Sequence, residues 1–263
     1  MSRSLYIETE GEGPDLVLLH GWGLHGGVWD SLMPRLTPQL RVTRVDLPGH
    51  GRSRHVAMPT SLQELTLQVM ADIAPGAVVL GWSLGGLVAL DAALEMPQRL
   101  RGLVLANATP RFVTAADWPH AMAPEQLQAF AAGLTQDYQE TLQHFLSLQV
   151  RGDDSARASL RQLREALFAH GEPDTASLAN GLIVLKDSDL RSRLRQVSVP
   201  TLVLAGAYDR LTPPGASEAM AEQIPGAQLE VFPKSAHAPF ISHAEAFASS
   251  VLGFVLGLHA EAA

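Results

Sequence analysis

The sequence predicts an α/β protein with a mostly parallel, doubly wound sheet and a helical lid inserted after the sixth strand. Two observations lead to this fold class. Short runs of Val and Leu, without polar alternation, are separated by longer stretches with helical apolar spacing, and such runs are typical of parallel strands covered on both faces. Between residues 111 and 195 the strand pattern stops, and only amphipathic helices are expected.

Composition narrows the classes of function. The 263 residues suffice for one large α/β domain, and the net charge of −8 argues against nonspecific nucleic-acid binding. No apolar run approaches the roughly 18 residues of a membrane span, and the first residues lack the apolar stretch of a secretory signal. We therefore expect a cytoplasmic monomer that binds neither nucleic acid nor membrane.

Metal sites are not expected either. Cysteine is absent, which removes disulfides, a thiol nucleophile and thiolate ligands. The ten histidines are scattered and form no H-E-x-x-H motif.

The elements of the core follow in order. The opening segment 5–16 is expected to form a strand and a turn, compatible with a hairpin. The runs predicted as strands are 17–21, 41–46, 77–83, 100–108, 200–209 and 227–233. The stretches predicted as helices between them are 25–36, 61–73, 85–97 and 214–224.

Residues 111–195 are predicted to form a helical lid inserted in a core made of residues 1–110 and 196–263. Amphipathic helices are expected in this insert at 123–134, 136–150, 153–170 and 175–186. Because the strand pattern resumes at Val199, an insert is favoured over a separate helical domain. Such inserts usually cover the carboxyl edge of the sheet, where ligands bind.

The segment Gly81-Trp82-Ser83-Leu84-Gly85 fits G-x-S-x-G between a predicted strand and a predicted helix. This is the context of a nucleophile elbow, in which a serine in a strained turn exposes its Oγ at the sheet edge. The pattern alone is weak, because Gly and Ser are common and the match can be a plain turn. Its value depends on finding an acid and a histidine later in the chain.

Asp209 and His237 supply these partners. Each directly follows a predicted strand, and the chain order Ser83, Asp209, His237 is the one that such hydrolases use. Serine becomes nucleophilic only if a histidine removes its proton, and a buried carboxylate must hold that histidine in the right tautomer. Of the other candidates, His243 falls within the next helical pattern, and His20 precedes the glycine turn.

The segment HGWGLHGG at 20–27 contains G-x-G-x-x-G, and Asp46 follows Gly26 by twenty residues. This is the outline of a dinucleotide-binding loop, but that alternative leaves Asp209 and His237 unexplained. We favour an oxyanion hole, in which the backbone N–H groups of Trp22 and Leu84 stabilise a transient negative charge. Asp46 is then a structural loop acid.

Four segments together resemble the α/β-hydrolase family of pimeloyl-(acyl-carrier protein) methyl ester esterases of biotin synthesis. These segments are LVLLHGWGL, VDLPGHGRS, LGWSLGGLVA and KSAHAPFISH, and the resemblance extends through nearly the whole chain. Trp82 in the elbow is one of its more specific marks. The resemblance implies the α/β-hydrolase fold, a serine carboxylesterase that releases methanol, no cofactor, and a substrate borne by an acyl-carrier protein.

The resemblance also implies where the substrate lies. Alongside the catalytic serine and histidine and the oxyanion residues, it points to Phe145, Leu146, Ser147, Leu148 and Gln149 as substrate-binding residues of the lid, although helix packing explains several of them equally well. Trp22 and Trp82 are candidates to wall the alcohol side of the site, with core packing as the alternative.

An acidic carrier needs a basic surface, and Arg157, Arg161 and Arg164 recur at helical spacing along one stripe of the lid. We expect these arginines to grip the carrier or its phosphopantetheine phosphate. A solvated helix face is the alternative, and nearby Asp153 and Asp154 dilute the charge. The family carries arginines at the positions of Glu140 and His144, so docking is expected to be rearranged or weaker here.

Two other functions remain open at this stage. A broad-specificity short-chain carboxylesterase would use the same catalytic residues, because these set the reaction while the lid sets the substrate. A hydrolase-like receptor could also keep all three residues and bind a ligand under its lid. Only turnover and substrate preference distinguish these functions.

Overall fold

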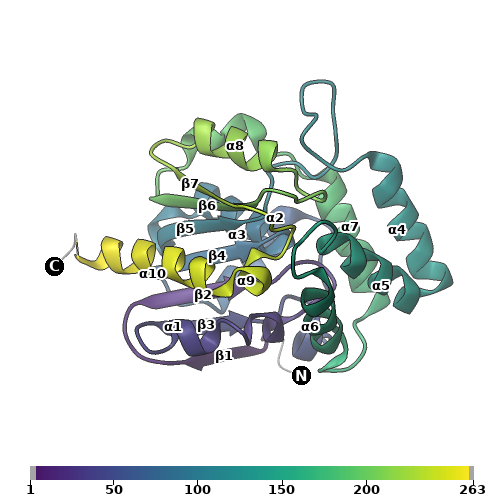
Figure 1. Cartoon of the computed structure of the whole chain (residues 1–263), viewed down its shortest axis with the longest axis horizontal. Coiled ribbons are helices and arrows are strands. Elements are labelled where there is room, and N and C mark those ends of the chain that lie inside the picture. Colours follow the sequence, from purple (N-terminus) through teal and green to yellow (C-terminus); the bar gives the residue numbers. More distant parts are fainter. Residues whose placement is uncertain (1–3, 261–263) are drawn as a thin grey trace.

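The computed structural model describes residues 4–260, and these contain a seven-stranded sheet in the order β1-β3-β2-β4-β5-β6-β7 (Figure 1). Every neighbouring pair is parallel except β1 with β3, which confirms the predicted mostly parallel sheet. The strands are β1 (Ile7–Glu10), β2 (Asp15–Leu19), β3 (Arg41–Val45), β4 (Ala77–Trp82), β5 (Leu100–Ala106), β6 (Thr201–Gly206) and β7 (Gln228–Phe232).

The opening segment forms the predicted strand, β1, but not the hairpin with which it was compatible. Strand β1 pairs antiparallel with β3, with Ile7 opposite Val45, and not with its sequence neighbour β2. The burial of the two strands explains the difference. Residues 16–19 of β2 are fully buried and need partners on both sides, which β3 and β4 supply, whereas the half-exposed β1 suits an edge.

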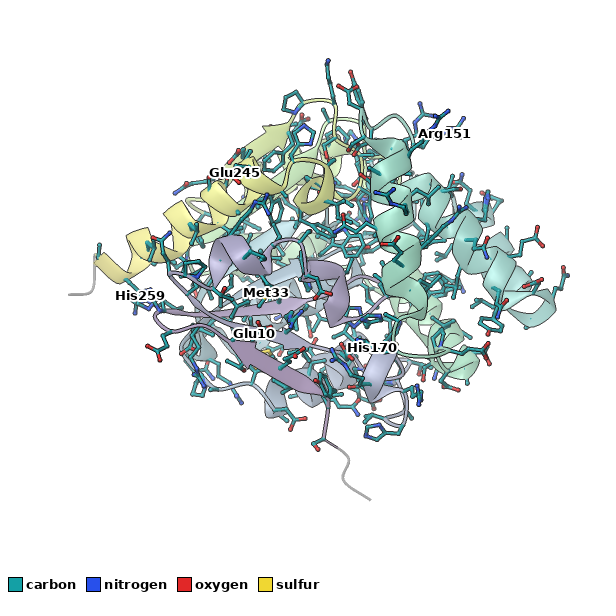
Figure 2. All side chains as sticks on the ribbon, turned by 60° about the horizontal axis from the view of Figure 1, so that its bottom comes forward. Glu10, Met33, Arg151, His170, Glu245 and His259 are labelled. Atoms are coloured by element: carbon teal, nitrogen blue, oxygen red, sulfur yellow. The ribbon has the colours of Figure 1, made fainter. Side chains whose placement is uncertain are left out.

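Helices cover both faces of the sheet. Helices α2 and α3 pack together and α3 lies against β4 and β5, while α1 packs against α10, which crosses in front of the sheet in Figure 1. An ion pair between Arg35 and Glu245, 2.9 Å long, joins α1 to the start of α10, where Glu245 is labelled in Figure 2. The core helices are α1 (Met33–Leu36), α2 (Leu62–Ala71), α3 (Leu84–Glu95), α8 (Pro214–Gln223), α9 (Pro239–Ser242) and α10 (Ala244–Ala260).

The single helix predicted over 25–36 is broken into two short pieces. A 3-10 helix spans Gly26–Trp29, and α1 begins only at Met33, with Pro34 in its first turn. Proline is accommodated at the start of a helix but not in its interior, and the Gly26–Gly27 pair is a poor helix former. Further 3-10 turns are η2 (Gly51–Ser53), η3 (Pro97–Arg99) and η4 (Arg191–Gln196).

The lid forms a group of helices on one side of the core (Figure 1). It follows β5, the fifth strand along the chain, so the expectation that it follows the sixth strand was wrong. The runs predicted before residue 111, one strand in the opening segment and four apolar runs, correspond to β1 to β5, so only the strand count was wrong. The lid helices are α4 (Pro124–Gln136), α5 (Tyr138–Gln149), α6 (Ala156–Phe168) and α7 (Thr175–Asp187).

Helix α6 anchors the lid to the core. It contacts the 3-10 helix at Gly26–Trp29, the short α9 and its lid neighbour α5. Leu163 and Leu167 are buried in these contacts, whereas Arg157, Arg161 and Arg164 are exposed. The buried leucines and the predicted basic stripe of α6 therefore face in different directions. Among residues 4–260, no helix is both long and apolar enough to cross a membrane.

Truncating a side chain in the central strand tests how tightly this core is packed. Leu18 of β2 is fully buried, so Leu18→Ala is expected to lower the free energy of unfolding by about 2–5 kcal/mol through lost burial and a residual cavity. Leu67 of α2 is 54% exposed, and Leu67→Ala should change it by no more than about 0.5 kcal/mol. Denaturant unfolding measures both, and equal losses would contradict this description of the core.

Candidate active site

Ser83 lies at a sharp turn between β4 and α3. Its backbone has φ 55° and ψ −117°, a strained left-handed conformation that a non-glycine residue adopts at a cost. The flanking glycines permit the turn, because a Cβ on Gly81 would lie 2.1 Å from the Gly85 carbonyl oxygen, and one on Gly85 would lie 2.4 Å from the Leu19 carbonyl oxygen. The G-x-S-x-G segment therefore has the geometry of a nucleophile elbow.

Leu84 is the first residue of α3. The first N–H groups of a helix have no partner within the helix, and the helix dipole is positive at this end. The amide that follows Ser83 therefore lies where negative charge is favoured.

The Gly21–Trp22 segment lies against this elbow. A Cβ on Gly21 would lie 3.2 Å from the Ser83 Cβ and 3.0 Å from the Trp82 ring. Trp22 follows directly, is buried, and donates its indole N–H to the carbonyl of Leu178 in α7 at 2.9 Å. The structure thus brings both predicted oxyanion residues to the neighbourhood of Ser83, and it ties one of them to the lid.

Asp209 and His237 form a buried pair. His237 Nδ1 donates to Asp209 Oδ2 at 2.7 Å, and both side chains are almost completely inaccessible. Asp209 Oδ2 also accepts from the Asn107 amide at 2.7 Å and from the Thr212 hydroxyl at 2.6 Å. Its Oδ1 accepts the backbone N–H groups of Leu211 and Thr212. The carboxylate is therefore held rigidly and orients the imidazole.

This network keeps Asp209 ionised. Burial by itself would raise the pKa of Asp209, but the nearby His237 and the hydrogen bonds from His237, Asn107 and Thr212 outweigh burial and lower it. A buried carboxylate that accepts several donors is stabilised in its charged form. It can in turn stabilise a positive charge on the adjacent imidazole.

The backbone of His237 makes two further hydrogen bonds. Its backbone N–H donates to the Gln149 carbonyl at the end of α5, and its carbonyl accepts the Trp82 indole N–H, each at 2.9 Å or less. The rings of Trp82 and His237 lie 5.4 Å apart. Because Trp82 directly precedes Ser83, these contacts bring His237 to the elbow.

The second ring nitrogen of His237 is unengaged. Nε2 is buried and has no hydrogen-bond partner among the described residues, Ser83 included. Bonds between catalytic groups are often long without substrate and tighten only in the reacting complex. The imidazole thus has a fixed tautomer, with Nδ1 bonded to Asp209 and Nε2 able to accept a proton.

The lid segment 145–149 lies partly in the core and partly at its surface. Phe145 packs edge-on against Trp22, with ring centroids 4.9 Å apart, and Leu146 is fully buried. Gln149 is buried and contacts His237 through its carbonyl. Ser147 and Leu148 are half-buried. The structure therefore brings Phe145 and Gln149 to Trp22 and His237, whereas Ser147 bonds within its own helix to His144.

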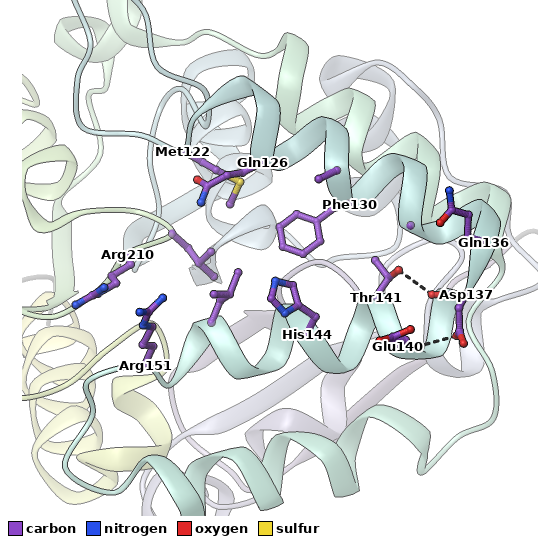
Figure 3. A pocket seen from close by; sticks show the side chains of 14 residues that line it. Met122, Gln126, Phe130, Gln136, Asp137, Glu140, Thr141, His144, Arg151 and Arg210 are labelled. Carbon is purple, nitrogen blue, oxygen red and sulfur yellow. Dashed lines mark hydrogen bonds between the residues drawn. The ribbon is translucent and has the colours of Figure 1, made fainter.

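A pocket of about 630 Å³ lies between α4 and α5 (Figure 3). Phe130, Leu148 and Leu211 give it an apolar middle. Figure 3 shows Arg151 and Arg210 together at one end, with Asp137 and Glu140 at the other. The remaining lining residues are Met122, Gln126, Ala129, Gly133, Gln136, Thr141 and His144.

The arginines of α6 differ from most others in the described chain. Arg157 and Arg164 are exposed and have no hydrogen-bond or ion-pair partner among residues 4–260, and Arg161 has only a 3.9 Å contact with Glu165. Of the acids expected to dilute this stripe, Asp153 is buried and accepts from Ser155, and Asp154 pairs with Lys234. These two acids are therefore engaged elsewhere, and the exposed Glu165 beside Arg161 is an acid that remains next to the stripe.

Asn107 and Thr212 were not anticipated, although both hold Asp209. Asn107 has φ 43° and follows β5 directly. A polar residue at the carboxyl end of a parallel strand is a sequence signal for a functional site, and this signal could have identified Asn107. Thr212 lies three residues after Asp209, within a loop whose fold the sequence does not reveal. His20 and His50 are also fully buried near the glycine segment, and no sequence pattern pointed to His50.

Asp46 joins its own loop to the glycine segment after β2. Its carboxylate accepts the Gly26 N–H at 2.7 Å and the Arg52 N–H at 2.8 Å. This occupies the side chain that a dinucleotide site would need for a ribose hydroxyl, and it fits the structural role expected for Asp46. Within residues 4–260, no group of three or more His, Asp or Glu side chains is arranged to hold a metal ion.

The chain is similar to known proteins over nearly its whole length. The family model described as the alpha/beta hydrolase fold matches residues 14–244. A pimeloyl-(acyl-carrier protein) methyl ester esterase of Nitrosomonas europaea is 47% identical over 247 residues, covering 94% of this chain and 97% of that protein. A protein of the same name from Xanthomonas oryzae is 46% identical, covering 95% and 98%.

Solved structures are similar over nearly the whole chain. An esterase from Exiguobacterium antarcticum has a TM-score of 0.86 at 26% identity and covers 95% of both chains. A hydrolase from Pseudomonas aeruginosa has a TM-score of 0.80 at 31% identity and covers 95% of this chain and 94% of that one. The similarity therefore includes the lid as well as the sheet.

The lowered pKa of Asp209 has a consequence for stability in acid. A carboxyl group with a lower pKa in the folded protein contributes stability above its unfolded value of 3.8, and this contribution is lost as pH falls through the folded pKa. The free energy of unfolding of the unmodified protein should therefore fall more steeply below about pH 4 than that of Asp209→Asn. Urea unfolding between pH 3 and pH 7 measures this difference, and parallel curves would contradict it.

Proposed function

Because the chain belongs to the alpha/beta hydrolase fold family and, within it, to the family of pimeloyl-(acyl-carrier protein) methyl ester esterases, we propose that Ser83, His237 and Asp209 act together to hydrolyse that methyl ester. The chain is a carboxylic ester hydrolase. Its products are methanol and pimeloyl-(acyl-carrier protein). The observation that carries the catalytic proposal is the buried Asp209–His237 hydrogen bond beside a strained serine.

In the first half-reaction Ser83 Oγ attacks the carbonyl carbon of the methyl ester. His237 Nε2, which has no other partner among the described residues, takes the hydroxyl proton and then delivers it to the departing methanol. Asp209 stays ionised and stabilises the imidazolium that exists between these steps. The backbone N–H groups of Trp22 and Leu84 hold the negative oxygen of the tetrahedral intermediate.

In the second half-reaction water replaces methanol. His237 removes a proton from water, which attacks the acyl-enzyme formed on Ser83. The tetrahedral intermediate collapses, the proton returns to Ser83 Oγ, and the free carboxylate of the pimeloyl chain is released. Apart from the attacking water, these steps use groups of this chain, because one histidine serves as base and acid in turn.

The substrate also contains a thioester that must survive. The methyl ester lies at the far end of the pimeloyl chain, and the thioester joins the chain to the bulky carrier. An enclosed site that admits the chain but not the carrier positions only the methyl ester at Ser83. The burial of Ser83 and His237, and the packing of Phe145 on Trp22, support such an enclosed site.

Carrier docking is proposed for the exposed stripe formed by Arg157, Arg161 and Arg164. Arginine binds carboxylates and phosphates through two parallel hydrogen bonds, and these side chains are almost free of internal partners. The acidic end of the α4–α5 pocket, with Asp137 and Glu140, would repel an acidic carrier. We therefore place the carrier over α6 and not over the first turns of α5.

Replacing Ser83 tests the nucleophile. Ser83→Ala should lower kcat/KM for the carrier-borne methyl ester by at least about 10⁴-fold, abolish labelling by a fluorophosphonate probe, and fail to rescue a biotin auxotroph that lacks its methyl esterase. Ser249→Ala, which changes an exposed serine of α10 outside the site, is the control and should keep activity and labelling. Persistent labelling of a folded Ser83→Ala protein would show that another residue is the nucleophile.

Charge reversal tests the carrier surface. The triple change Arg157→Glu, Arg161→Glu and Arg164→Glu should raise KM for the carrier-borne ester by about 10-fold or more and leave hydrolysis of p-nitrophenyl butyrate unchanged. Arg195→Glu changes another exposed arginine outside the lid helices. It should leave both the KM for the carrier-borne ester and the hydrolysis of p-nitrophenyl butyrate unchanged. Equal effects on both substrates would refute this docking surface. If the unmodified protein prefers the short ester, it is a broad carboxylesterase instead.

A further inference from the structure

Two histidines are buried beneath the loop that carries Trp22, and the mechanism above does not use them. His20 and His50 are fully inaccessible, and their rings lie 5.3 Å apart. One precedes the glycine segment and the other belongs to the loop after β3. Each makes hydrogen bonds through both ring nitrogens.

His20 fixes the peptide unit on one side of Trp22. Its Nδ1 bonds to the Gly21 carbonyl at 2.8 Å, and its Nε2 accepts the Leu47 N–H at 2.9 Å. The Gly21 carbonyl and the Trp22 N–H belong to the same planar trans peptide, so they point in opposite directions. Holding the carbonyl toward His20 therefore sets the direction in which the Trp22 N–H points.

His50 fixes the peptide unit on the other side. Its Nε2 accepts the Gly23 N–H at 3.1 Å, and its Nδ1 donates to the Pro48 carbonyl at 2.8 Å. Gly23 has φ +79°, a conformation that suits glycine. The two peptide planes that meet at the Trp22 Cα are therefore each held by one imidazole.

Both rings must be neutral to make these bonds. A protonated imidazole has no acceptor nitrogen, whereas each Nε2 here accepts a backbone N–H. Burial lowers the pKa of His20 to about 3 and that of His50 to about 4. Both side chains thus accept at neutral pH with the proton on Nδ1.

We propose that His50, together with His20, is a positioning residue that aims the Trp22 N–H at the negative oxygen formed during ester hydrolysis. This inference rests on the proposed function, because it assigns His50 a task in the same reaction. His50 would align the Trp22 N–H before negative charge develops on the ester oxygen. Donors that are already aligned stabilise the transition state most effectively. His50 does not touch the substrate.

The test compares an oxoester with its thionoester. Sulfur is a weaker hydrogen-bond acceptor than oxygen, so a well-aligned oxyanion hole favours p-nitrophenyl butyrate over its thiono analogue. His50→Leu removes the acceptor for the Gly23 N–H, and it should lower kcat on the oxoester by about 10- to 100-fold, less than complete loss of a donor. KM should change little, and the oxoester-to-thionoester ratio of kcat/KM should shrink.

A conservative variant and a control keep this test sharp. The amide oxygen of His50→Gln can accept the Gly23 N–H, so this variant should recover part of both kcat and the ratio. His55→Gln, an exposed histidine after the same loop, should match the unmodified protein. If His50→Leu does not fold, His50→Gln still decides, because a ratio equal to that of the unmodified protein combined with a lowered kcat would assign His50 a merely structural role.

The failure of this inference can be told from the failure of the proposed function. If the unmodified protein cleaves neither ester and takes no fluorophosphonate label, the proposed function fails. If it cleaves the oxoester rapidly and folded His50→Leu retains both kcat and the oxoester-to-thionoester ratio, only the role of His50 is overturned.

Discussion

The hydrogen bond between Asp209 and His237 is the interaction on which the rest of the site depends. A charged carboxylate in the protein interior is costly unless several donors satisfy it, and here Asn107, Thr212 and two backbone N–H groups do so. The Thr212 hydroxyl and the two N–H groups belong to the same loop as Asp209. Asn107 reaches the carboxylate because β5 and β6 are neighbours, so the residues that follow each strand meet at one edge. The order of strands thus supports the chemistry directly.

The lid is bound to the same centre and does more than cover it. The carbonyl of Gln149 at the end of α5 accepts the His237 N–H, and the carbonyl of Leu178 in α7 accepts the Trp22 indole N–H. Two lid helices therefore contact His237 and the loop that carries Trp22 separately. Changes in the lid should affect the alignment of catalytic groups as well as the choice of substrate, since misplacement by about 1 Å is enough to slow a reaction markedly.

Prediction from sequence succeeded where the information is local or tied to strand ends. The elbow is five consecutive residues, and Asp209 and His237 stand directly after apolar runs, so their meeting follows from parallel strands. The antiparallel pairing of β1 with β3 and the break between Trp29 and Met33 were missed. The pairing of β1 depends on which strands occupy the buried centre of the sheet. The helix break depends on Pro34 and on the Gly26–Gly27 pair, which disfavour one continuous helix over residues 25–36. The roles of Thr212 and His50 depend on loop conformations that no residue pattern specifies.

Combining substitutions tests most directly whether the three residues form one catalytic unit. Groups that act together show strongly non-additive effects, so one loss leaves little for the next to remove. Three variants are compared with p-nitrophenyl butyrate as substrate: Ser83→Ala, His237→Ala, and the triple variant that combines both changes with Asp209→Ala. All three should have nearly the same residual kcat/KM. If the losses of the single variants instead multiplied in the combined variant, the residues would act independently, and the buried hydrogen bond between Asp209 and His237 would not be the basis of catalysis.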